Sequence, residues 1–295
     1  MRCGVIGTGA LGRGIVASLA RAGFPVLVHD RDASAAAAAA RAGGEAVASV
    51  GAVAAGSDAI FLILPDSPDV FAVVGEIGDD FAAGSVVAII STVSPETPVE
   101  LARQLAGRGV DVLDCPISGG PSRAESGDLS VMVGGEAAVL ARIRPPLEAI
   151  GSAVVHVGPL GHGQIAKLAN NLMGAVIIEG IAEGLALAAK AGADVQRVSE
   201  AIAGGSGSSW ILREWVPETV FAGDYTRRFS LDLMCKDMGI ISAFADELGV
   251  PVPGLEVARE AFERAVAKGF GNDDFSRAIQ LHVDEAGADL GVPEQ

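Results

Sequence analysis

The first half of the chain alternates short apolar runs with helical stretches, and most of these runs are continuously apolar. They occupy residues 3–6, 25–29, 59–64, 85–90, 110–114, 130–133 and 153–157. Continuous apolar runs of this length are typical of strands that helices cover on both faces. Strands that alternate with helices indicate βαβ units. The pattern therefore predicts a doubly wound α/β sheet that extends to about residue 157.

After residue 158 the strand pattern stops and the chain becomes helical. Residues 163–191 are small and apolar with few charges, and Gly192 supplies a stop signal. At 1.5 Å per residue this gives a helix of roughly 40 Å, long enough to link two domains. Further helices are expected at residues 195–203, 230–248, 255–268 and 275–285. We predict an α/β domain at residues 1–162 and an all-α domain at residues 163–295, joined by this long interdomain helix.

A glycine-rich turn follows the first predicted strand. The segment Gly7-Thr8-Gly9-Ala10-Leu11-Gly12 leads directly into a predicted helix. The first glycine permits a tight turn, the second lets the backbone approach a pyrophosphate, and the third allows the helix to pack closely. Asp30 ends the second strand, where a carboxylate accepts hydrogen bonds from ribose hydroxyls. This context predicts a Rossmann-type domain that binds a dinucleotide.

The residues after the second strand bear on the choice of cofactor. Asp30 would repel the 2′-phosphate of NADP, whereas the guanidinium of Arg31 could pair with it. We predict NAD as the cofactor, with NADP as the open alternative.

Composition excludes several classes of protein. Half of the residues are hydrophobic and 20% are charged, which excludes disorder. There are 37 acidic against 21 basic residues, a formal net charge of -16, and no Lys/Arg-rich run, so nucleic acid and anionic membranes are poor partners.

Cysteine and histidine placement gives no sign of a disulfide framework or a metal site. Cys3, Cys115 and Cys235 are far apart, and the four histidines lack metal-ligand spacing. The N-terminus lacks the features of a signal peptide, and the best apolar stretch contains Glu179 and Glu183. We therefore expect a cytoplasmic, unanchored protein in a reducing compartment.

Two further segments carry candidate chemistry. Ser118 is followed by Gly119 and Gly120, whose unhindered backbone N–H groups could hold a carboxylate, although a bare turn explains the segment nearly as well. Lys167 and Asn171 are four residues apart and share one face of the long helix. A lone helical lysine is usually a solvated surface charge.

The neighbours of Lys167 favour a different reading of that lysine. They are small or apolar, which suggests a helix enclosed by protein. Because enclosure disfavours an ammonium group, an enclosed lysine exchanges protons closer to neutral pH. Lys167 is therefore the candidate acid/base.

Taken together and in order, four segments resemble the β-hydroxyacid dehydrogenases. This group contains 3-hydroxyisobutyrate dehydrogenase, tartronate semialdehyde reductase and the succinic semialdehyde/glyoxylate reductases. The segments are the glycine turn, residues 114–120 with the trailing residues 132–135, residues 161–171 and residues 233–237. The resemblance covers essentially the whole chain.

The resemblance implies a role for each matching residue. It implies that Lys167 is the catalytic acid/base and that Asn171 helps to hold the substrate. The matching carboxylate-binding residues are Ser118, Gly119 and Gly120. The matching dinucleotide-binding residues are Gly7, Thr8, Gly9, Ala10, Leu11, Gly12, Asp30, Arg31, Leu64, Pro65, Ser91 and Thr92, with Phe229 and Lys236 toward the nicotinamide.

Three departures from the family pattern stand out. The family often has Met at the position of Leu11 and Ala at the position of Cys115. Members that prefer NADP often have Asn-Arg-Thr or Asn-Arg-Ser where this chain has Asp30-Arg31-Asp32. No catalytic group is lost, but the cofactor preference stays open.

We therefore predict an NAD(P)-dependent 3-hydroxyacid dehydrogenase that acts on a small carboxylate and assembles as a homodimer or homotetramer. The far end of the substrate is expected to meet loops such as residues 206–210. The alternatives are an imine or semialdehyde reductase of the same fold, or a non-catalytic dinucleotide-binding module. Imine reductases carry Asp or Tyr where this chain has Lys167, and a binding module has no need of Lys167 and Asn171 together.

Overall fold

The computed structural model describes residues 1–291. The chain separates into two compact units, Met1–Leu168 and Ala169–Gln295. The first unit is built around a sheet, and the second is helical.

The sheet of the first unit has the strand order β3-β2-β1-β4-β5-β6-β8-β7, with β9 paired to β8. Its strands are β1 (Cys3–Ile6), β2 (Val26–His29), β3 (Glu45–Ala46), β4 (Ala59–Leu62), β5 (Val86–Ile89), β6 (Asp111–Asp114), β7 (Ile117–Ser118), β8 (Ser130–Gly134) and β9 (Ala153–Gly158). Every predicted strand is present within about two residues of its expected ends, within the usual disagreement over element boundaries. The two-residue strands β3 and β7 were not predicted, because two residues carry no periodic signal.

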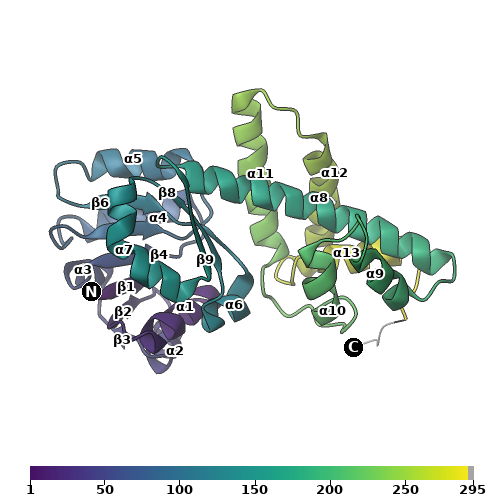
Figure 1. The fold of residues 1–295 in the computed structure, drawn as a ribbon, viewed down its shortest axis with the longest axis horizontal. Coiled ribbons are helices and arrows are strands. Elements are labelled where there is room, and N and C mark those ends of the chain that lie inside the picture. The colour runs from purple at the N-terminus through teal and green to yellow at the C-terminus, as the bar shows by residue number, and fades with distance from the viewer. Residues whose placement is uncertain (292–295) are drawn as a thin grey trace. The chain divides into compact units, whose positions relative to one another are not determined.

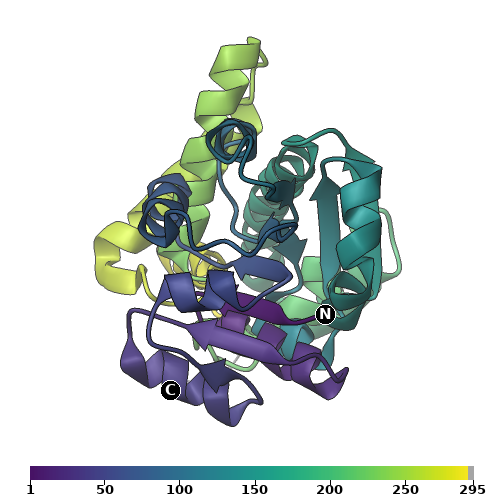
Figure 2. The same cartoon turned by 90° about the vertical axis from the view of Figure 1, so that its left-hand side faces the viewer.

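Helices cover both faces of this sheet (Figures 1 and 2). They are α1 (Ala10–Arg21), α2 (Ala33–Arg41), α3 (Val50–Ala55), α4 (Ser67–Ile77), α5 (Glu96–Gln104), α6 (Gly120–Ser126), α7 (Ala137–Ile150) and the start of α8 (His162–Lys190). One buried cluster joins Phe61 of β4 to Ile15 of α1, and the other joins Ile60 of β4 to Val70 of α4. The side chains of neighbouring residues in one strand thus pack into the clusters on opposite faces of the sheet. The predicted doubly wound sheet is confirmed.

The far side of the sheet departs from a pure βαβ pattern. Strands β2, β1, β4, β5 and β6 pair in parallel, whereas β8 runs antiparallel to β6 and β7. Strand β8 lies between β6 and β7 in the strand order, and the two-residue connection after β6 contains no crossover helix. Strand β9 pairs with β8 alone, and its Val155 is 51% exposed, so the expectation of a covered strand is wrong there.

The second unit is helical, as predicted. It contains most of α8, then α9 (Val195–Ala203), a π turn η1 (Ile211–Trp215), α10 (Val216–Glu218), α11 (Leu231–Leu248), α12 (Pro253–Ala265), a π turn η2 (Val266–Phe270) and α13 (Arg277–Glu285). Helices α11 and α12 lie side by side (Figure 1). Buried Ile178 of α8, Phe262 of α12 and Ile279 of α13 contribute to the core of this unit.

Helix α8 is buried on one side only. Ala175, Ile178 and Ala182 are buried, whereas Met173 is 61% and Leu187 is 74% exposed. The expected enclosure is present at Lys167 and Leu168, which are 9% and 3% exposed, but it does not extend along the whole helix. A helix that is apolar all round does not reveal which side is covered. By length and composition α8 could cross a membrane, a test that core helices of soluble proteins also pass.

Candidate active site

The three glycines of the turn after β1 differ in how closely other atoms approach them. Gly7 has a φ of 92°, and a Cβ atom there would lie 2.1 Å from the Ile63 carbonyl oxygen. A Cβ atom on Gly12 would lie 2.1 Å from the Gly7 carbonyl oxygen. Around a Cβ atom on Gly9, no atom lies within 4 Å. The outer two glycines are required by the fold, whereas Gly9 borders open space.

The start of α1 is suited to a phosphate group. Gly9 is the N-cap residue, so no side chain caps the helix. Uncapped N–H groups and the helix dipole favour an anion, and the space at Gly9 lets one approach the backbone. These residues fit the pyrophosphate of a dinucleotide.

The carboxylate of Asp30 is held against the glycine turn. Its Oδ2 accepts hydrogen bonds from the Thr8 backbone N–H at 2.6 Å and the Thr8 hydroxyl at 3.2 Å. Its Oδ1 accepts from the Asp32 backbone N–H at 2.9 Å. Thr8 is almost fully buried, whereas Arg31 is exposed. The structure thus fixes the Asp30 carboxylate at the end of β2, next to the glycine turn.

Ser91 ties together the segments that follow β4 and β5. Its hydroxyl accepts a hydrogen bond from the Leu64 backbone N–H at 2.7 Å and donates to the Leu62 carbonyl at 3.3 Å. Leu64, Pro65 and Thr92 therefore lie at the carboxyl edge of the parallel strands, the edge that also carries the glycine turn. Ligands of doubly wound sheets bind at this edge.

The proposed carboxylate loop begins where β7 ends at Ser118. Gly119 and Gly120 have φ values of 138° and 75°, a left-handed region in which side chains are strained, so both positions favour glycine. All three residues are partly exposed. Cys115, by contrast, is fully buried, and burial raises the pKa of its thiol well above the ordinary value. Cys115 is therefore an inert packing residue.

Asp114, at the end of β6, holds the beginning of α8. Its side chain is fully buried; Oδ1 accepts from the Gly161 backbone N–H at 2.7 Å and Oδ2 from the Gln164 backbone N–H at 2.8 Å. Burial raises the pKa of Asp114, and these backbone hydrogen bonds partly oppose that rise. Lys167 lies one turn further along α8 and is only 9% exposed.

Gln164 connects the same helix to the segment after β5. It is fully buried; Oε1 accepts from the Val93 backbone N–H at 3.1 Å, and Nε2 donates to the Ser91 carbonyl at 2.9 Å. Sequence reasoning assigned no role to Asp114 or Gln164. The available signal was two polar residues among apolar ones, one at the end of a strand and one at the start of a helix.

In the second unit, Asn171 and Lys236 meet at one carboxylate. The Asn171 side-chain amide donates to Asp237 Oδ2 at 2.6 Å, and the Lys236 ammonium lies 2.8 Å from Asp237 Oδ1. Asn171 is 6% exposed and Asp237 is 1% exposed. Asn171 was predicted to contact the substrate and Lys236 the cofactor. The structure brings these two residues together although they are 65 positions apart in the sequence.

Asp274 fixes the segment that carries Phe229. Buried Asp274 accepts from the Phe229 backbone N–H at 3.1 Å and from the Trp215 indole N–H at 2.8 Å. Ring contacts run from Trp210 to Trp215, then to Phe275 and Phe229, with centroid separations of 5.5, 5.3 and 5.9 Å. This aromatic chain links the loop at residues 206–210 to Phe229, a connection that the sequence did not indicate.

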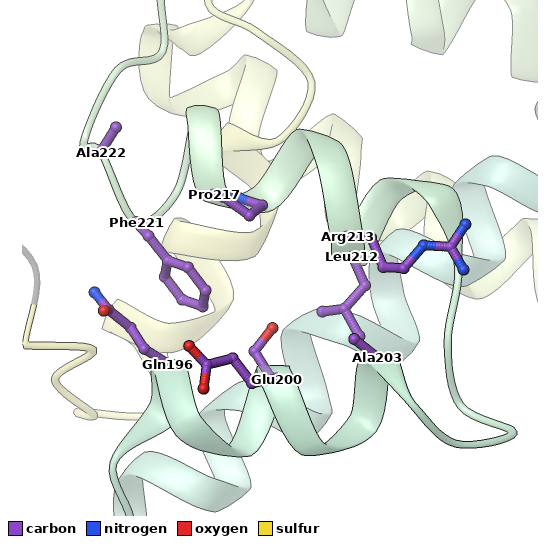
Figure 3. A pocket seen from close by; sticks show the side chains of 9 residues that line it. Gln196, Glu200, Ala203, Leu212, Arg213, Pro217, Phe221 and Ala222 are labelled. Atoms are coloured by element: carbon purple, nitrogen blue, oxygen red, sulfur yellow. The ribbon is translucent and has the colours of Figure 1, made fainter.

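A depression of about 440 Å³ lies elsewhere in the second unit, between α9 and the turn that follows the same loop. Gln196 and Glu200 rise from α9 toward Phe221 and Pro217 (Figure 3). None of the predicted site residues lines it. The predicted site residues instead form one group in each unit, with Lys167 in the first group and Asn171 in the second.

Two family models together match most of the chain. Residues 2–158 match the NAD binding domain of 6-phosphogluconate dehydrogenase. Residues 161–282 match the NAD-binding domain of NADP-dependent 3-hydroxyisobutyrate dehydrogenase.

Individual relatives match over nearly their full length. The 2-(hydroxymethyl)glutarate dehydrogenase of Eubacterium barkeri is 34% identical over 95% of this chain and 94% of its own. The 2-hydroxy-3-oxopropionate reductase of Escherichia coli is 36% identical over 95% and 96%. The crystal structure of 3-hydroxyisobutyrate dehydrogenase from Salmonella typhimurium is 31% identical, with a TM-score of 0.86 over 95% of this chain and 99% of that one. The resemblance found in the sequence is confirmed: the chain belongs to the β-hydroxyacid dehydrogenase family and is an NAD(P)-dependent hydroxyacid dehydrogenase.

Proposed function

We propose that the substrate is a small acid of the form HOCH₂–CH(X)–COO⁻, whose hydroxymethyl group is oxidised reversibly to an aldehyde. Relatives of this chain are named for 3-hydroxyisobutyrate, L-serine and 2-(hydroxymethyl)glutarate. These three acids share the hydroxymethyl and carboxylate groups on one carbon and differ only in X. A carboxylate cradle together with an acid/base for the hydroxyl therefore suffices for the whole class.

Lys167 is the acid/base in this proposal, and its burial at the anchored start of α8 is the observation that carries it. The neutral amine takes the hydroxyl proton during oxidation, and the ammonium form returns a proton during reduction. Bound NAD(P) supplies the hydride acceptor or donor. Asn171 donates a hydrogen bond to the same oxygen as negative charge develops there.

Ser118, Gly119 and Gly120 hold the substrate carboxylate. The positive-φ glycines that follow β7 support this role, because successive backbone N–H groups on residues without a side chain of their own can bind one anion. Fixing the carboxylate aligns the hydroxyl carbon for hydride transfer.

Replacement of Lys167 tests the acid/base assignment. We expect Lys167→Ala to lose at least about 100-fold in kcat, because general acid–base catalysis contributes that much or more. Dinucleotide binding, followed by NADH fluorescence, should persist. Lys190→Ala, at the far end of the same helix, is the matched control and should keep wild-type turnover. Near wild-type kcat in Lys167→Ala would refute the assignment.

We propose NAD as the preferred cofactor because the fixed Asp30 carboxylate would repel a 2′-phosphate. In Asp30→Asn this repulsion is removed while Arg31 remains. The ratio of kcat/KM for NADP to that for NAD should therefore rise by about tenfold or more, corresponding to about 1.4 kcal/mol. An unchanged ratio would show that Asp30 does not set the preference.

The substituent X is identified by screening. Candidates are 3-hydroxyisobutyrate, 3-hydroxypropionate, glycerate and serine, each tested with both cofactors, and 4-hydroxybutyrate serves as a chain-length control. NAD(P)H production from at least one of the first four but not from the last supports the class, and the acid with the highest kcat/KM identifies X. Reduction of cyclic imines in place of hydroxy-acid oxidation would contradict it.

A homodimer or homotetramer is also proposed. The exposed side of α8 carries Met173, Val176 and Leu187, and a Cβ atom at Gly180 or Gly184 would meet no atom within 4 Å. An apolar stripe of this kind is suited to burial against a second copy. Leu187→Glu should lower the mass measured by light scattering, and an unchanged mass would place the interface elsewhere.

We propose that the protein works in the cytoplasm on a small carboxylate, without a nucleic-acid or membrane partner. The net charge of -16 supports this, because anionic polymers and lipid surfaces repel an acidic protein. Recovery of the enzyme in the membrane fraction of lysed cells would contradict the proposal.

A further inference from the structure

Two buried polar residues link helix α8, which carries Lys167, to the sheet. Neither belongs to the residues predicted to contact the substrate. Asp114 binds the backbone at the start of α8, and Gln164 binds the segment after β5. Both are fully buried. Burial of an amide or a carboxylate is costly unless its hydrogen bonds are made, so both contacts hold these groups to a narrow geometry.

The two residues act on the same first turn of α8. Asp114 accepts from the N–H groups of Gly161 and Gln164, which fixes where α8 begins and its direction. A Cβ atom on Gly163 would lie 2.6 Å from the Asp114 carboxylate, so the helix approaches Asp114 as closely as glycine allows. Gln164 then fixes the rotation of α8, because its side chain must reach both Ser91 and Val93.

The Gln164 contact continues to the dinucleotide edge of the sheet. Its Nε2 donates to the Ser91 carbonyl, and the Ser91 hydroxyl accepts from the Leu64 backbone N–H. Thr92 lies between the two residues that Gln164 binds. One chain of hydrogen bonds therefore joins the segments predicted to lie along the dinucleotide with the turn of α8 that precedes Lys167.

From this arrangement we propose that Asp114 and Gln164 are positioning residues for the Lys167 amine. They set the place of Lys167 relative to the segments that hold the dinucleotide, and so relative to the carbon that exchanges hydride. The proposal rests on the acid/base role proposed for Lys167. A misplacement of about 1 Å in a reacting group can cost about 100-fold in rate.

Gln164→Leu tests the proposal, because it removes both side-chain contacts at similar volume. We expect kcat to fall by about 100-fold, and this fall should exceed any rise in the dinucleotide Kd by at least about tenfold. The matched control is Gln280→Leu, since Gln280 also makes two side-chain hydrogen bonds, with Tyr225 and Asp284. The control should keep wild-type kcat.

A double variant separates positioning from general stabilisation. If Gln164 acts through Lys167, Gln164→Leu adds little loss to Lys167→Ala, because the group being positioned is already gone. A purely structural residue would lower the residual rate by the same factor in both backgrounds. Gln164→Met, with its flexible unbranched side chain, replaces Gln164→Leu if the latter does not fold.

The outcomes separate this inference from the proposed function. Full activity in Lys167→Ala refutes the acid/base assignment and the inference together. An inactive Lys167→Ala with wild-type kcat in Gln164→Leu overturns the inference alone. It is also overturned if the two losses multiply in the double variant, or if Gln164→Leu weakens only dinucleotide binding.

Discussion

At the scale of single residues, Gly9 and Gly12 should respond to the same substitution in opposite ways. A methyl group on Gly12 would collide with the Gly7 carbonyl oxygen, so Gly12→Ala should lower the melting temperature. A methyl group on Gly9 meets no protein atom within 4 Å, and its backbone φ of -56° suits alanine. We expect Gly9→Ala to keep the wild-type melting temperature and to raise the NADH Kd by about tenfold or more. Thermal denaturation and fluorescence titration measure the two quantities.

The opposite pattern would contradict this reading of the turn. If Gly9→Ala bound NADH normally, the open space at Gly9 would not receive the pyrophosphate. Gly23→Ala tests whether glycine replacement is harmful in general. Gly23 also borders open space but has a φ of 87°, so its replacement should lower stability without changing the NADH Kd.

The three cysteine thiols should react slowly in the native protein. Cys3 and Cys115 are fully buried, and burial, with help from Glu263 and Asp232, raises the pKa of Cys235 from 9.0 to about 11. A thiol with a higher pKa is deprotonated in a smaller fraction of molecules. At about pH 8 the thiolate fraction of Cys235 is therefore about 100-fold lower than that of a thiol with the ordinary pKa. A thiol-reactive dye should therefore label Cys235 slowly and label all three cysteines only after denaturation. Rapid labelling of the native protein would contradict these burial assignments.

The sequence indicates those candidate site residues whose proposed role depends on local spacing. Gly7, Gly9 and Gly12 are recognisable because each stands at a fixed position between a strand and a helix. Asp114 and Gln164 could not be assigned in this way. Their contacts join backbone groups about 50 and 70 residues away, and no local pattern marks such a partner.

At the scale of elements, Asp274 should be important for the stability of the segment before α11. The Trp215 indole donates to Asp274, which also accepts from the Phe229 backbone N–H. Trp215→Phe leaves the buried carboxylate with one donor fewer, and we expect the free energy of unfolding to fall by about 2 kcal/mol. Urea denaturation followed by circular dichroism measures this change.

Trp210→Phe is the control for that substitution. Trp210 contacts the Trp215 ring but is 41% exposed, so its replacement should cost less than about 1 kcal/mol. Equal losses in the two variants would mean that ring packing, rather than the bond to Asp274, stabilises the segment.

The sequence predicted these elements correctly, but it predicted their burial only where both faces are covered. Strands such as β4 and β5, with a core on each face, are visible as continuous apolar runs. Helix α8 is equally apolar, yet one side is exposed in this chain. The composition of a segment indicates that its surface is apolar, but it does not indicate which part of the protein packs against that surface. The same limit applies to β9, whose apolar residues lie at the edge of the sheet.

At the scale of the whole molecule, charge and the exposed side of α8 act in opposite directions on assembly. Each copy carries a formal charge of -16, so two copies repel each other, whereas burial of Met173 and Leu187 would draw them together. Salt weakens the repulsion, because the screening length falls from about 10 Å at 0.1 M to about 3 Å at 1 M. We therefore expect the dissociation constant of the proposed oligomer, measured by analytical ultracentrifugation, to decrease as sodium chloride rises over this range. Leu187→Glu should weaken assembly at every salt concentration and should be relieved only in part by salt. Tighter assembly at low salt would instead mean that ion pairs hold the copies together, and α8 would then not be the interface.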